Sequence, residues 1–385
     1  MGKINNYNAR SQKALIFIPD ISGFTRFIND TDISHSRHII SELLEVIIES
    51  NELNLKVSEI EGDAVLFYQT GGIPDAWQLA AQVKKMFINF HNYLKIIERD
   101  NVCQCGACSM APGLTIKFFA HSGEISLSRI KGREQLMGKD VILAHRIMKN
   151  DVPGNEYLLI TKPYLDHEAL TGSLDAFDWS DLRSGESGYE HIGIVPYKYV
   201  TLTPLRTEVV TPPMHKSAEK YDNPVSIDIT VDAPVAVVYD LIIDLNTRSK
   251  WRYGLRNIWF DSEAVPRIGS VHVCDLEMGK TRIEAVEMFA DEGSREYAER
   301  MLDNRFFPEA TTFFNLKPGE NGTELHVEFH YRRRAVMGWL IDLMMRKKVK
   351  NSMERSAGNL KNLCEEISRE KKDPSAMREK SLNQD

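Results

Sequence analysis

Two aspartates of this chain each stand at the end of an apolar, strand-like run and beside a glycine-containing turn. The runs are Phe17-Ile18-Pro19-Asp20-Ile21 and Glu59-Ile60-Glu61-Gly62-Asp63-Ala64-Val65. Mg²⁺ takes hard oxygen ligands and is usually shared between a few carboxylates and the phosphates of a substrate. If both aspartates serve one metal site, the fold must bring these two strand ends together. The sequence therefore predicts a Mg²⁺ site at Asp20 and Asp63.

The segment that follows Asp20 predicts a binding site for phosphate. Ser22-Gly23-Phe24-Thr25 opens an amphipathic stretch in which Phe24, Phe27 and Ile28 indicate a helix. Backbone N–H groups at the start of a helix favour an anion. A metal site next to a helix start indicates a nucleoside triphosphate.

Four motifs resemble, in their order and spacing, those of class III nucleotidyl cyclases. They are Asp20-Ile21-x-Gly23-Phe24-Thr25, Gly62-Asp63, His121-x-Gly123-Glu124 and Gly138-x-x-Val141-x-x-Ala144-x-Arg146. The resemblance covers residues 11–205 and implies a ferredoxin-like α+β domain. It also implies a homodimer that binds a purine nucleoside triphosphate with Mg²⁺ or Mn²⁺. An active member is a phosphorus–oxygen lyase that forms a cyclic nucleotide.

The resemblance also assigns roles to the residues of the first two motifs. It implies that Asp20, the carbonyl of Ile21 and Asp63 hold two metal ions, and that Phe24 and Thr25 cradle the triphosphate. The simpler interpretation of an isolated aspartate is a turn or helix-cap residue, because aspartate is favoured in both places. Two strand-end aspartates within an ordered set of motifs favour metal binding.

The later motifs carry both matches and departures. By resemblance, Arg146 stabilises the transition state across the dimer, and Glu59 and Gln135 occupy the purine-reading positions. A glutamate at position 59 resembles guanylate cyclases. Ile142 stands where the family has an asparagine that donates a hydrogen bond, and the lysine loop expected near residues 191–193 is not recognisable. Loss of one such donor typically costs about two to three orders of magnitude in rate.

Two functions from different classes therefore remain open. One is a nucleotidyl cyclase with slow turnover, and the other is a catalytically inactive cyclase-like module that acts as a nucleotide or lipid sensor or scaffold in signalling. Asp20 and Asp63 favour the first function, whereas Ile142 favours the second.

Composition limits the other functions that this chain can have. The chain has 385 residues, of which 42% are hydrophobic and 27% charged, and its formal net charge is −7. This balance fits two globular domains and argues against a general nucleic-acid surface. The sequence has no apolar run of membrane-spanning length and no signal-peptide core, so we expect a cytoplasmic protein.

Three of the five cysteines lie within six residues, at Cys103, Cys105 and Cys108. Three thiols at this spacing can bind Zn²⁺ or an iron–sulfur cluster if a fourth ligand is present. Reduced thiols in a turn and a Cys105–Cys108 disulfide are the alternatives. We expect these cysteines in a loop that enters the strand Leu114–Phe119. The candidates for the fourth ligand are His91, His121, Cys274 and a residue of a partner chain.

Apolar periodicity predicts the remaining elements of residues 11–205. The expected strands are Ala14–Ile18, Lys56–Ile60 and Ala64–Gln69, and the expected helices are Ile39–Asn51, Asp75–Arg99 and Val141–Lys149.

A second domain follows a linker at residues 206–221, where Pro212 and Pro213 favour exposed, extended backbone. Alternation predicts a strand at Val225–Val231, and Asp232-Ala233-Pro234 predicts a helix start. Further strands are expected at Ser270–Glu277, Thr281–Phe289, Thr311–Lys317 and Glu324–Arg332, before a long helix at 335–367. The final residues 369–385 are polar and aromatic-free, and we expect them to be disordered.

This second pattern resembles the START-like (SRPBCC, polyketide-cyclase-type) helix-grip fold over residues 222–368. Residues 231–240 and Trp251 carry the resemblance, which implies an apolar small molecule or lipid between the sheet and the long helix. Arg332–Arg334 and Arg346–Lys348 could favour an anionic membrane surface. A solvated basic face is the commoner interpretation of such runs.

Overall fold

The computed structural model describes residues 11–372, apart from 31–32, 104, 132, 167–173, 214, 216–217, 262–263, 278, 292, 305, 308 and 333–338. The chain divides into two compact units. Unit 1 comprises Met1–Arg99 and Cys105–Pro212, and unit 2 comprises Asp100–Gln104 and Pro213–Asp385. The division after Pro212 falls inside the segment predicted as a linker.

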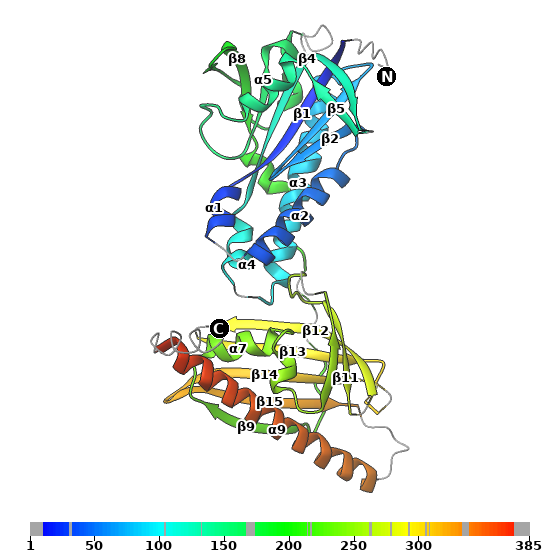
Figure 1. Cartoon of the computed structure of the whole chain (residues 1–385), viewed down its shortest axis with the longest axis vertical. Coiled ribbons are helices and arrows are strands. Elements are labelled where there is room, and N and C mark those ends of the chain that lie inside the picture. Colours follow the sequence, from blue (N-terminus) through cyan, green and yellow to red (C-terminus); the bar gives the residue numbers. More distant parts are fainter. Residues whose placement is uncertain are drawn as a thin grey trace, which may run out of the picture. The chain divides into compact units, whose positions relative to one another are not determined.

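Unit 1 is built on a β-α-β-β-α-β core (Figure 1). Its elements are β1 (Gln12–Ser22), α1 (Phe24–Asn29), α2 (Ile33–Glu49), β2 (Lys56–Glu61), β3 (Ala64–Thr70), α3 (Ala76–Asp100) and β4 (Thr115–Ile130). The four strands lie in the order β2-β3-β1-β4, and each is antiparallel to its neighbours. This order and connectivity are ferredoxin-like, so the α+β fold predicted for this part of the chain is observed.

Further elements extend the sheet beyond β4. They are α4 (Gly106–Met110), η1 (Ala111–Gly113), β5 (Arg133–Met137), α5 (Lys139–Ile147), β6 (Tyr157–Thr161), α6 (Lys162–Leu165), η3 (Leu174–Phe177), β7 (Arg183–Tyr189), β8 (Gly193–Thr201) and η4 (Thr203–Glu208). β6 pairs parallel to β4, and β8 and β7 follow antiparallel. β5 pairs with the far end of β4.

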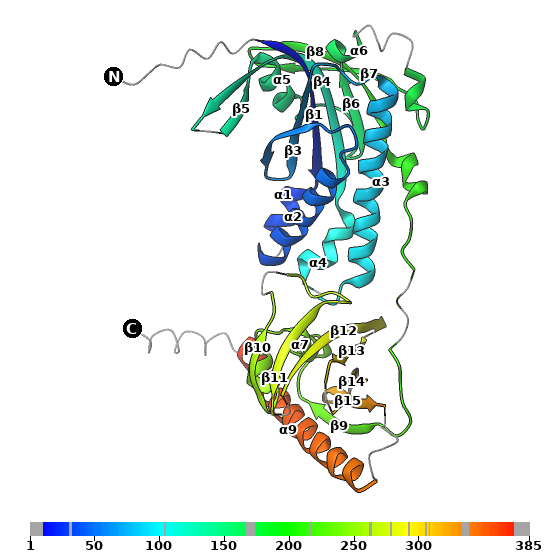
Figure 2. The ribbon, with the colours of Figure 1, turned by 90° about the vertical axis from the view of Figure 1, so that its right-hand side faces the viewer.

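β1 is deeply buried in this sheet because it lies between β3 and β4 and is covered on both faces. Ile16 and Ile18 pack in one apolar cluster with residues of α5. Phe17 points to the opposite face and stacks on Phe118 of β4 at 5.8 Å between ring centroids. Figure 2 shows α3 lying along the sheet. The Leu, Val, Met and Phe residues that predicted α3 are all buried: Leu79, Val83, Met86, Phe87 and Phe90.

Two glycines allow α5 to pack closely on β4. A Cβ on Gly123 would lie 2.3 Å from Cγ of Asp140, and a Cβ on Gly138 would lie 2.9 Å from the carbonyl oxygen of Glu124. In the space left by Gly123, Asp140 accepts a hydrogen bond from the backbone N–H of Glu124 at 2.7 Å. Its other oxygen lies 3.3 Å from Nε2 of His121. The His121-x-Gly123-Glu124 motif thus positions the helix that carries Arg146.

Two predictions for unit 1 are corrected by the structure. The helix predicted at Ile39–Asn51 is α2, which begins six residues earlier at Ile33. The cysteine segment lies between α3 and β4, as predicted, but it is not wholly irregular, because Cys105 is the N-cap of the short helix α4, Cys108 lies within α4, and Ala111–Gly113 forms a 3₁₀ turn. Short helical turns of this kind have too few residues to show an apolar period in the sequence.

Unit 2 is a seven-stranded antiparallel sheet with a long C-terminal helix across it (Figure 1). Its elements are β9 (Val225–Val231), α7 (Val235–Ile243), α8 (Arg248–Trp251), β10 (Leu255–Trp259), β11 (Val271–Leu276), β12 (Gly279–Asp291), β13 (Ser294–Leu302), β14 (Ala310–Gly319), β15 (Gly322–Tyr331) and α9 (Trp339–Lys372). The strand order is β10-β11-β12-β13-β14-β15-β9. The predicted helix-grip arrangement of sheet and long helix is observed.

Several details of unit 2 differ from the predictions. Strands β10 and β13 were not predicted, because charged and aromatic residues alternate irregularly along both. Asp232 does not cap α7, because the N-cap of this helix is Pro234. The backbone N–H of Asp232 donates a hydrogen bond to the carboxylate of Glu365. α9 runs four residues into the segment predicted as disordered, and an i,i+4 ion pair of Arg369 with Glu365 (3.5 Å) supports this last part. Residues 333–338 and 373–385 lie outside the described residues.

The packing at Gly123 yields a stability prediction. Gly123→Ala would force Asp140 to move and to give up its hydrogen bonds, so we expect a loss of about 1–3 kcal/mol. The melting temperature should fall by roughly 2–4 °C for each kcal/mol. Thermal unfolding followed by circular dichroism measures this change. The matched control is Gly188→Ala in β7, where no atom lies within 4 Å of the added Cβ; an equal fall in both variants would contradict the prediction.

Candidate functional site

The register of β1 brings the predicted metal ligands together. Asp20 lies opposite Ala64 of β3 on one side and opposite Lys117 of β4 on the other. Asp63 directly precedes Ala64, in the two-residue turn between β2 and β3. The backbone N–H of Ile21 donates to the carbonyl oxygen of Asp63 at 3.0 Å and fixes this turn against the end of β1.

The two carboxylates lie in an environment that disfavours their negative charges. Burial raises the pKa of Asp20 above its ordinary value, and the charge of Lys117 offsets part of that effect. Burial and then the negative charge of Asp20 raise the pKa of Asp63 to about 6. Each ionised carboxylate therefore destabilises the other, and a cation between them would relieve the repulsion.

Lys117 is the residue of this site that sequence reasoning missed. Its Nζ lies 3.1 Å from Oδ2 of Asp20, and both side chains are largely buried. A single cation in the otherwise apolar run 116–119 was the available signal. One lysine for two carboxylates leaves an excess negative charge, so the donor set of Asp20 and Asp63 fits a divalent metal ion.

The chain after Asp20 adds two further features to this site. Ser22 lies on the same face of β1 as Asp20, and its buried Oγ has no hydrogen-bond partner within the described chain. A buried orphaned hydroxyl is costly unless a ligand satisfies it. The ring of Phe24 lies within van der Waals reach of the Gly62 turn. Thr25 is exposed, and α1 is only six residues long.

The predicted purine-reading residues lie on two neighbouring strands. Glu59 is on β2 and Gln135 is exposed on β5, and these two strands contact each other. His145 of α5, which sequence reasoning also missed, lies 3.5 Å from a carboxylate oxygen of Glu59 and 3.4 Å from one of Glu61. Glu59 therefore already has a neighbour that a purine would have to displace or share.

Arg146 and Ile142 lie one turn apart on the outer face of α5. Ile142 is 58% exposed, and three apolar side chains of β2 and β5 are also exposed: Val57, Ile60 and Met137. The site residue Arg146 thus lies apart from the carboxylate pair and faces away from the core of its own unit.

The segment expected to hold a lysine forms the tip of a hairpin. β7 and β8 are joined by residues 190–192, and His191 there has a φ of 62° and a largely exposed side chain. The family's lysine has no counterpart at this tip, as the sequence indicated.

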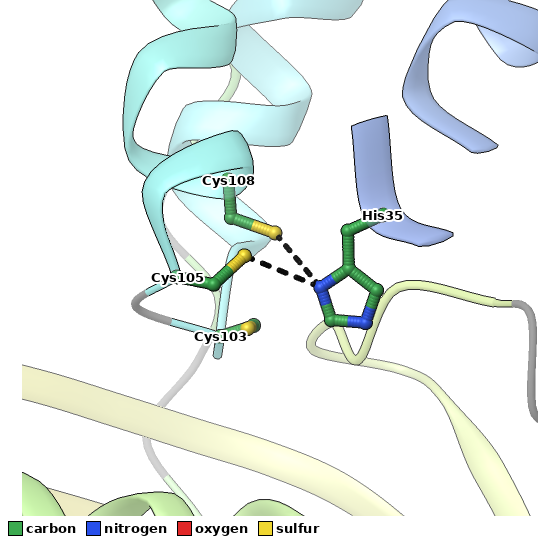
Figure 3. Close-up of side chains that lie close together, drawn as sticks. All are labelled: His35, Cys103, Cys105 and Cys108. Atoms are coloured by element: carbon green, nitrogen blue, oxygen red, sulfur yellow. Dashed lines mark hydrogen bonds between the residues drawn. The ribbon is translucent and has the colours of Figure 1, made fainter. Parts of the chain in front are cut away.

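The three clustered cysteines lie beside a histidine that was not among the expected ligands. Figure 3 shows His35 of α2 turned toward Cys105 and Cys108. The expected ligands have other neighbours: His91 lies 2.9 Å from Glu156, His121 contacts Thr161 and Asp140, and Cys274 lies on β11 of unit 2. The five cysteines form no disulfide.

Unit 2 contains a cavity of about 400 Å³ between its sheet and α9. This volume is within the usual range of small-molecule sites. Apolar side chains and cations share the wall: Met301, Phe307, Phe329, Met353, Arg252, Lys348 and Arg355.

A buried ion pair lies near this cavity. Arg248 and Glu299 pair at 2.6 Å, and although burial raises the pKa of Glu299, Arg248 holds it below the ordinary value. Arg252 faces the same Glu299, and its own pKa is lowered by burial. The charge of Glu299 therefore acts on both arginines, and its ion pair is with Arg248.

The basic runs near the C-terminus are only partly described. Arg346 donates hydrogen bonds to the carbonyl oxygens of Asn223 and Pro224 at 2.6 and 3.0 Å. The side chain of Met344, beside the second basic run, is 64% exposed and lies outside the core of unit 2. Among the described helices, none has the length and apolar character needed to cross a membrane. Arg333 and Arg334 lie outside the described residues.

Two family models match separate parts of the chain. Residues 224–365 match the family described as "Polyketide cyclase / dehydrase and lipid transport". The helix-grip arrangement of sheet and long helix in unit 2 agrees with this match. Residues 40–157 match "Protein of unknown function (DUF2652)". An uncharacterized protein of Mycobacterium tuberculosis is 36% identical over 122 residues, which are 32% of this chain and 57% of that protein. The chain thus spans little more than half the length of this relative.

Solved structures similar to this chain include class III cyclase catalytic domains and START superfamily proteins. A guanylate cyclase domain from Catenaria anguillulae, in complex with GTP, covers 50% of this chain and 98% of its own, with 16% identity and a TM-score of 0.36. The adenylyl cyclase CyaB from P. aeruginosa covers 50% and 95%, with 16% identity and a TM-score of 0.34. A START superfamily protein from Mycobacterium smegmatis covers 37% and 98%, with 17% identity and a TM-score of 0.30. Because these TM-scores are below 0.5, the fold assignment rests on the strand order of each unit.

The raised pKa of Asp63 yields a pH-dependent prediction for the metal-free protein. The folded state holds this pKa at about 6, whereas the unfolded chain has the ordinary value of about 4. Ionisation therefore favours unfolding, and stability falls as the pH rises from about 4 through 6. Asp63→Asn should remove this loss, which solvent screening keeps modest because the carboxyl is only about half buried.

Thermal unfolding in EDTA at pH 4.5 and pH 7.5 measures the effect. We expect Asp63→Asn to raise the melting temperature, relative to the unsubstituted protein, by several degrees more at pH 7.5 than at pH 4.5. Asp181→Asn is the control, because it removes an exposed carboxylate elsewhere in unit 1. A gain in Asp63→Asn that is equal at both pH values would contradict the prediction.

Proposed function

We propose that this protein binds a Mg- or Mn-purine nucleoside triphosphate in unit 1 and cyclises it slowly at a homodimer interface. The observation that carries the proposal is the convergence of Asp20, near the end of β1, with Asp63, in the turn between β2 and β3. Burial disfavours the charge of both carboxylates, and Lys117 is the cation beside them. A purely structural role does not explain this arrangement, because each buried charge lowers the stability of the fold. The order of the four cyclase-like motifs supports the same conclusion.

Different residues of the proposed site would bind the metal and the phosphates. Asp20, Asp63 and the carbonyl of Ile21 would hold the metal, which supplies charge neutralisation and favours deprotonation of the ribose 3′-hydroxyl. Ser22 has an unsatisfied hydroxyl that can donate to a phosphate oxygen. When the nucleotide binds, the ammonium group of Lys117 would leave Asp20 and pair with a phosphate oxygen. The positive charge of Lys117 would then offset part of the negative charge of the phosphates.

The proposed reaction is an in-line displacement. The 3′-oxygen attacks the α-phosphorus, and the new P–O bond closes the cyclic nucleotide. The bond between the α-phosphorus and the oxygen that bridges it to the β-phosphorus breaks, and pyrophosphate leaves. Arg146 of the other protomer would stabilise the negative charge that develops on the phosphate oxygens.

The exposed face of unit 1 supports a homodimer. Val57, Ile60, Met137 and Ile142 expose apolar surface on β2, β5 and α5. Arg146 lies on the same outer side of α5 as Ile142. Burial of this surface by a second copy would remove apolar area from water and bring a partner arginine toward the carboxylates.

A second candidate function is nucleotide binding without turnover. Ile142 favours it, because the isoleucine side chain cannot donate the hydrogen bond that the family's asparagine provides. In that case unit 1 acts as a nucleotide sensor or scaffold in signalling.

Unit 2 would carry a small molecule or lipid. The 400 Å³ cavity offers apolar walls at Phe307 and Phe329 and cations at Arg252 and Lys348. An apolar molecule with an anionic end fits this wall better than a hydrocarbon does. The reduced cysteines and the nucleotide substrate suggest the cytoplasm as the location.

The test of the proposed function is metal-dependent nucleotide binding. Asp20→Asn and Asp63→Asn should each weaken the binding of a fluorescent GTP or ATP analogue by at least about tenfold with Mg²⁺ or Mn²⁺, since each removes an anionic donor. Fluorescence anisotropy measures the affinity, and mass spectrometry of the products separates a cyclase from a sensor. Asp166→Asn, at an exposed carboxylate of unit 1, is the control. Unchanged affinity in both site variants would overturn the assignment.

The purine preference can be tested with a matched pair of variants. If Glu59 accepts hydrogen bonds from guanine, GTP should bind more tightly than ATP, and Glu59→Lys should reduce or invert that preference. Glu61→Lys changes the charge equally and also lies beside His145, so it should leave the ratio of affinities unchanged. Competition binding with both nucleotides measures the ratio. Equal shifts in the two variants would show that Glu59 acts only through its charge.

A further inference from the structure

The four side chains His35, Cys103, Cys105 and Cys108 offer one ligand atom each, and these atoms all lie within 4.8 Å of one another. From this geometry we infer a mononuclear, structural Zn²⁺ site with three thiolates and one imidazole. The inference is independent of nucleotide binding, because it involves none of the residues of the carboxylate site.

The local structure explains how two of the cysteines face the same point. Cys105 is the N-cap of α4, and Cys108 lies three residues later, in its first turn. Residues three apart on a helical turn lie on the same side, so both sulfur atoms point away from α4 in one direction. Cys103 precedes Cys105 by two residues.

His35 completes the ligand set from a distant part of the sequence. It lies near the start of α2, and α2 contacts α4 within unit 1. Its Nδ1 lies 3.3 Å from Sγ of Cys105 and 3.7 Å from Sγ of Cys108 (Figure 3). Ligand atoms of a tetrahedral zinc site, with bonds of about 2.3 Å to sulfur and about 2.0 Å to nitrogen, are roughly 3.6 Å apart. The two observed distances lie on either side of this value.

The same distances argue against the other interpretations of the cysteine cluster. An iron–sulfur cluster binds its cysteines through different iron atoms, which spreads the ligands wider than a single ion does. A Cys105–Cys108 disulfide would leave His35 without a ligand role. Four ligands close the coordination shell, so the site is structural and not catalytic.

The consequence for unit 1 is a fixed start of α2. α1, α2 and α4 contact one another, and α1 is the segment that directly follows Asp20 and Ser22. Zinc would join α2 to α4 and so hold α1 at the end of β1. Its removal should increase hydrogen exchange at the start of α2 more than in α5.

The first experiment measures metal in the full chain, purified under reducing conditions without chelators. We expect about one zinc ion per chain by plasma mass spectrometry. Replacement by Co²⁺ should give tetrahedral d–d bands and a thiolate-to-metal charge-transfer band. Folded protein without bound zinc and without cobalt–thiolate absorption would overturn the inference, and so would iron as the dominant metal.

The second experiment identifies the ligands. Cys105→Ser, Cys108→Ser and His35→Ala should each lower zinc affinity by at least about tenfold. His35→Cys should restore binding, because a thiolate can replace the imidazole. The control is Cys274→Ala, at a buried cysteine of unit 2 that should not affect zinc. Retention of zinc in His35→Ala, or an equal loss in Cys274→Ala, would overturn the ligand assignment. If a variant fails to fold, the cobalt spectrum of the unsubstituted chain still decides whether thiolates bind the metal.

Discussion

The register of β1 between β3 and β4 is the constraint on which the proposed nucleotide site depends. Asp20 lies opposite Ala64 and Lys117, so the same ladder of hydrogen bonds places one carboxylate next to the Asp63 turn and next to a lysine. A shift by one residue would turn Asp20 to the other face of the sheet. The close packing of β1 opposes this shift, because the shift would turn Asp20 toward the apolar face on which Phe17 stacks on Phe118. The packing of the sheet thus keeps two repelling carboxylates close together.

The same sheet also positions the helix with the candidate catalytic arginine. Gly123 makes room for Asp140, which accepts a hydrogen bond from Glu124 and contacts His121. The histidine motif therefore acts on the fold, and through it on α5, without contacting the carboxylate pair. Arg146 is held in a defined direction, but it faces outward. The proposed site is therefore incomplete within one copy of unit 1, and this is why we propose a dimer.

The inferred zinc site, with three of its four ligands in unit 1, and the carboxylate pair depend on different kinds of structure. The carboxylates are close in space because their strands are paired. The cysteine cluster depends instead on the short helix α4, on the residues just before it and on one histidine from α2. The first site costs stability until a cation binds, whereas the second would add stability by joining α2 to α4. A function that needs a strained site can be supported in this way by a rigid neighbour.

The sequence by itself determined the two-domain α+β organisation, the strand-end aspartates and the cysteine cluster, because each is encoded by residues close together in the chain. Periodic apolar residues predicted α3, β9 and most other long elements. Only the tertiary structure decided which distant residues join these sites. Lys117 meets Asp20 through strand register, His145 meets Glu59 through helix packing, and His35 meets the cysteines across some seventy positions of the chain. Such neighbours depend on how whole elements pack, and local sequence patterns carry no record of that packing.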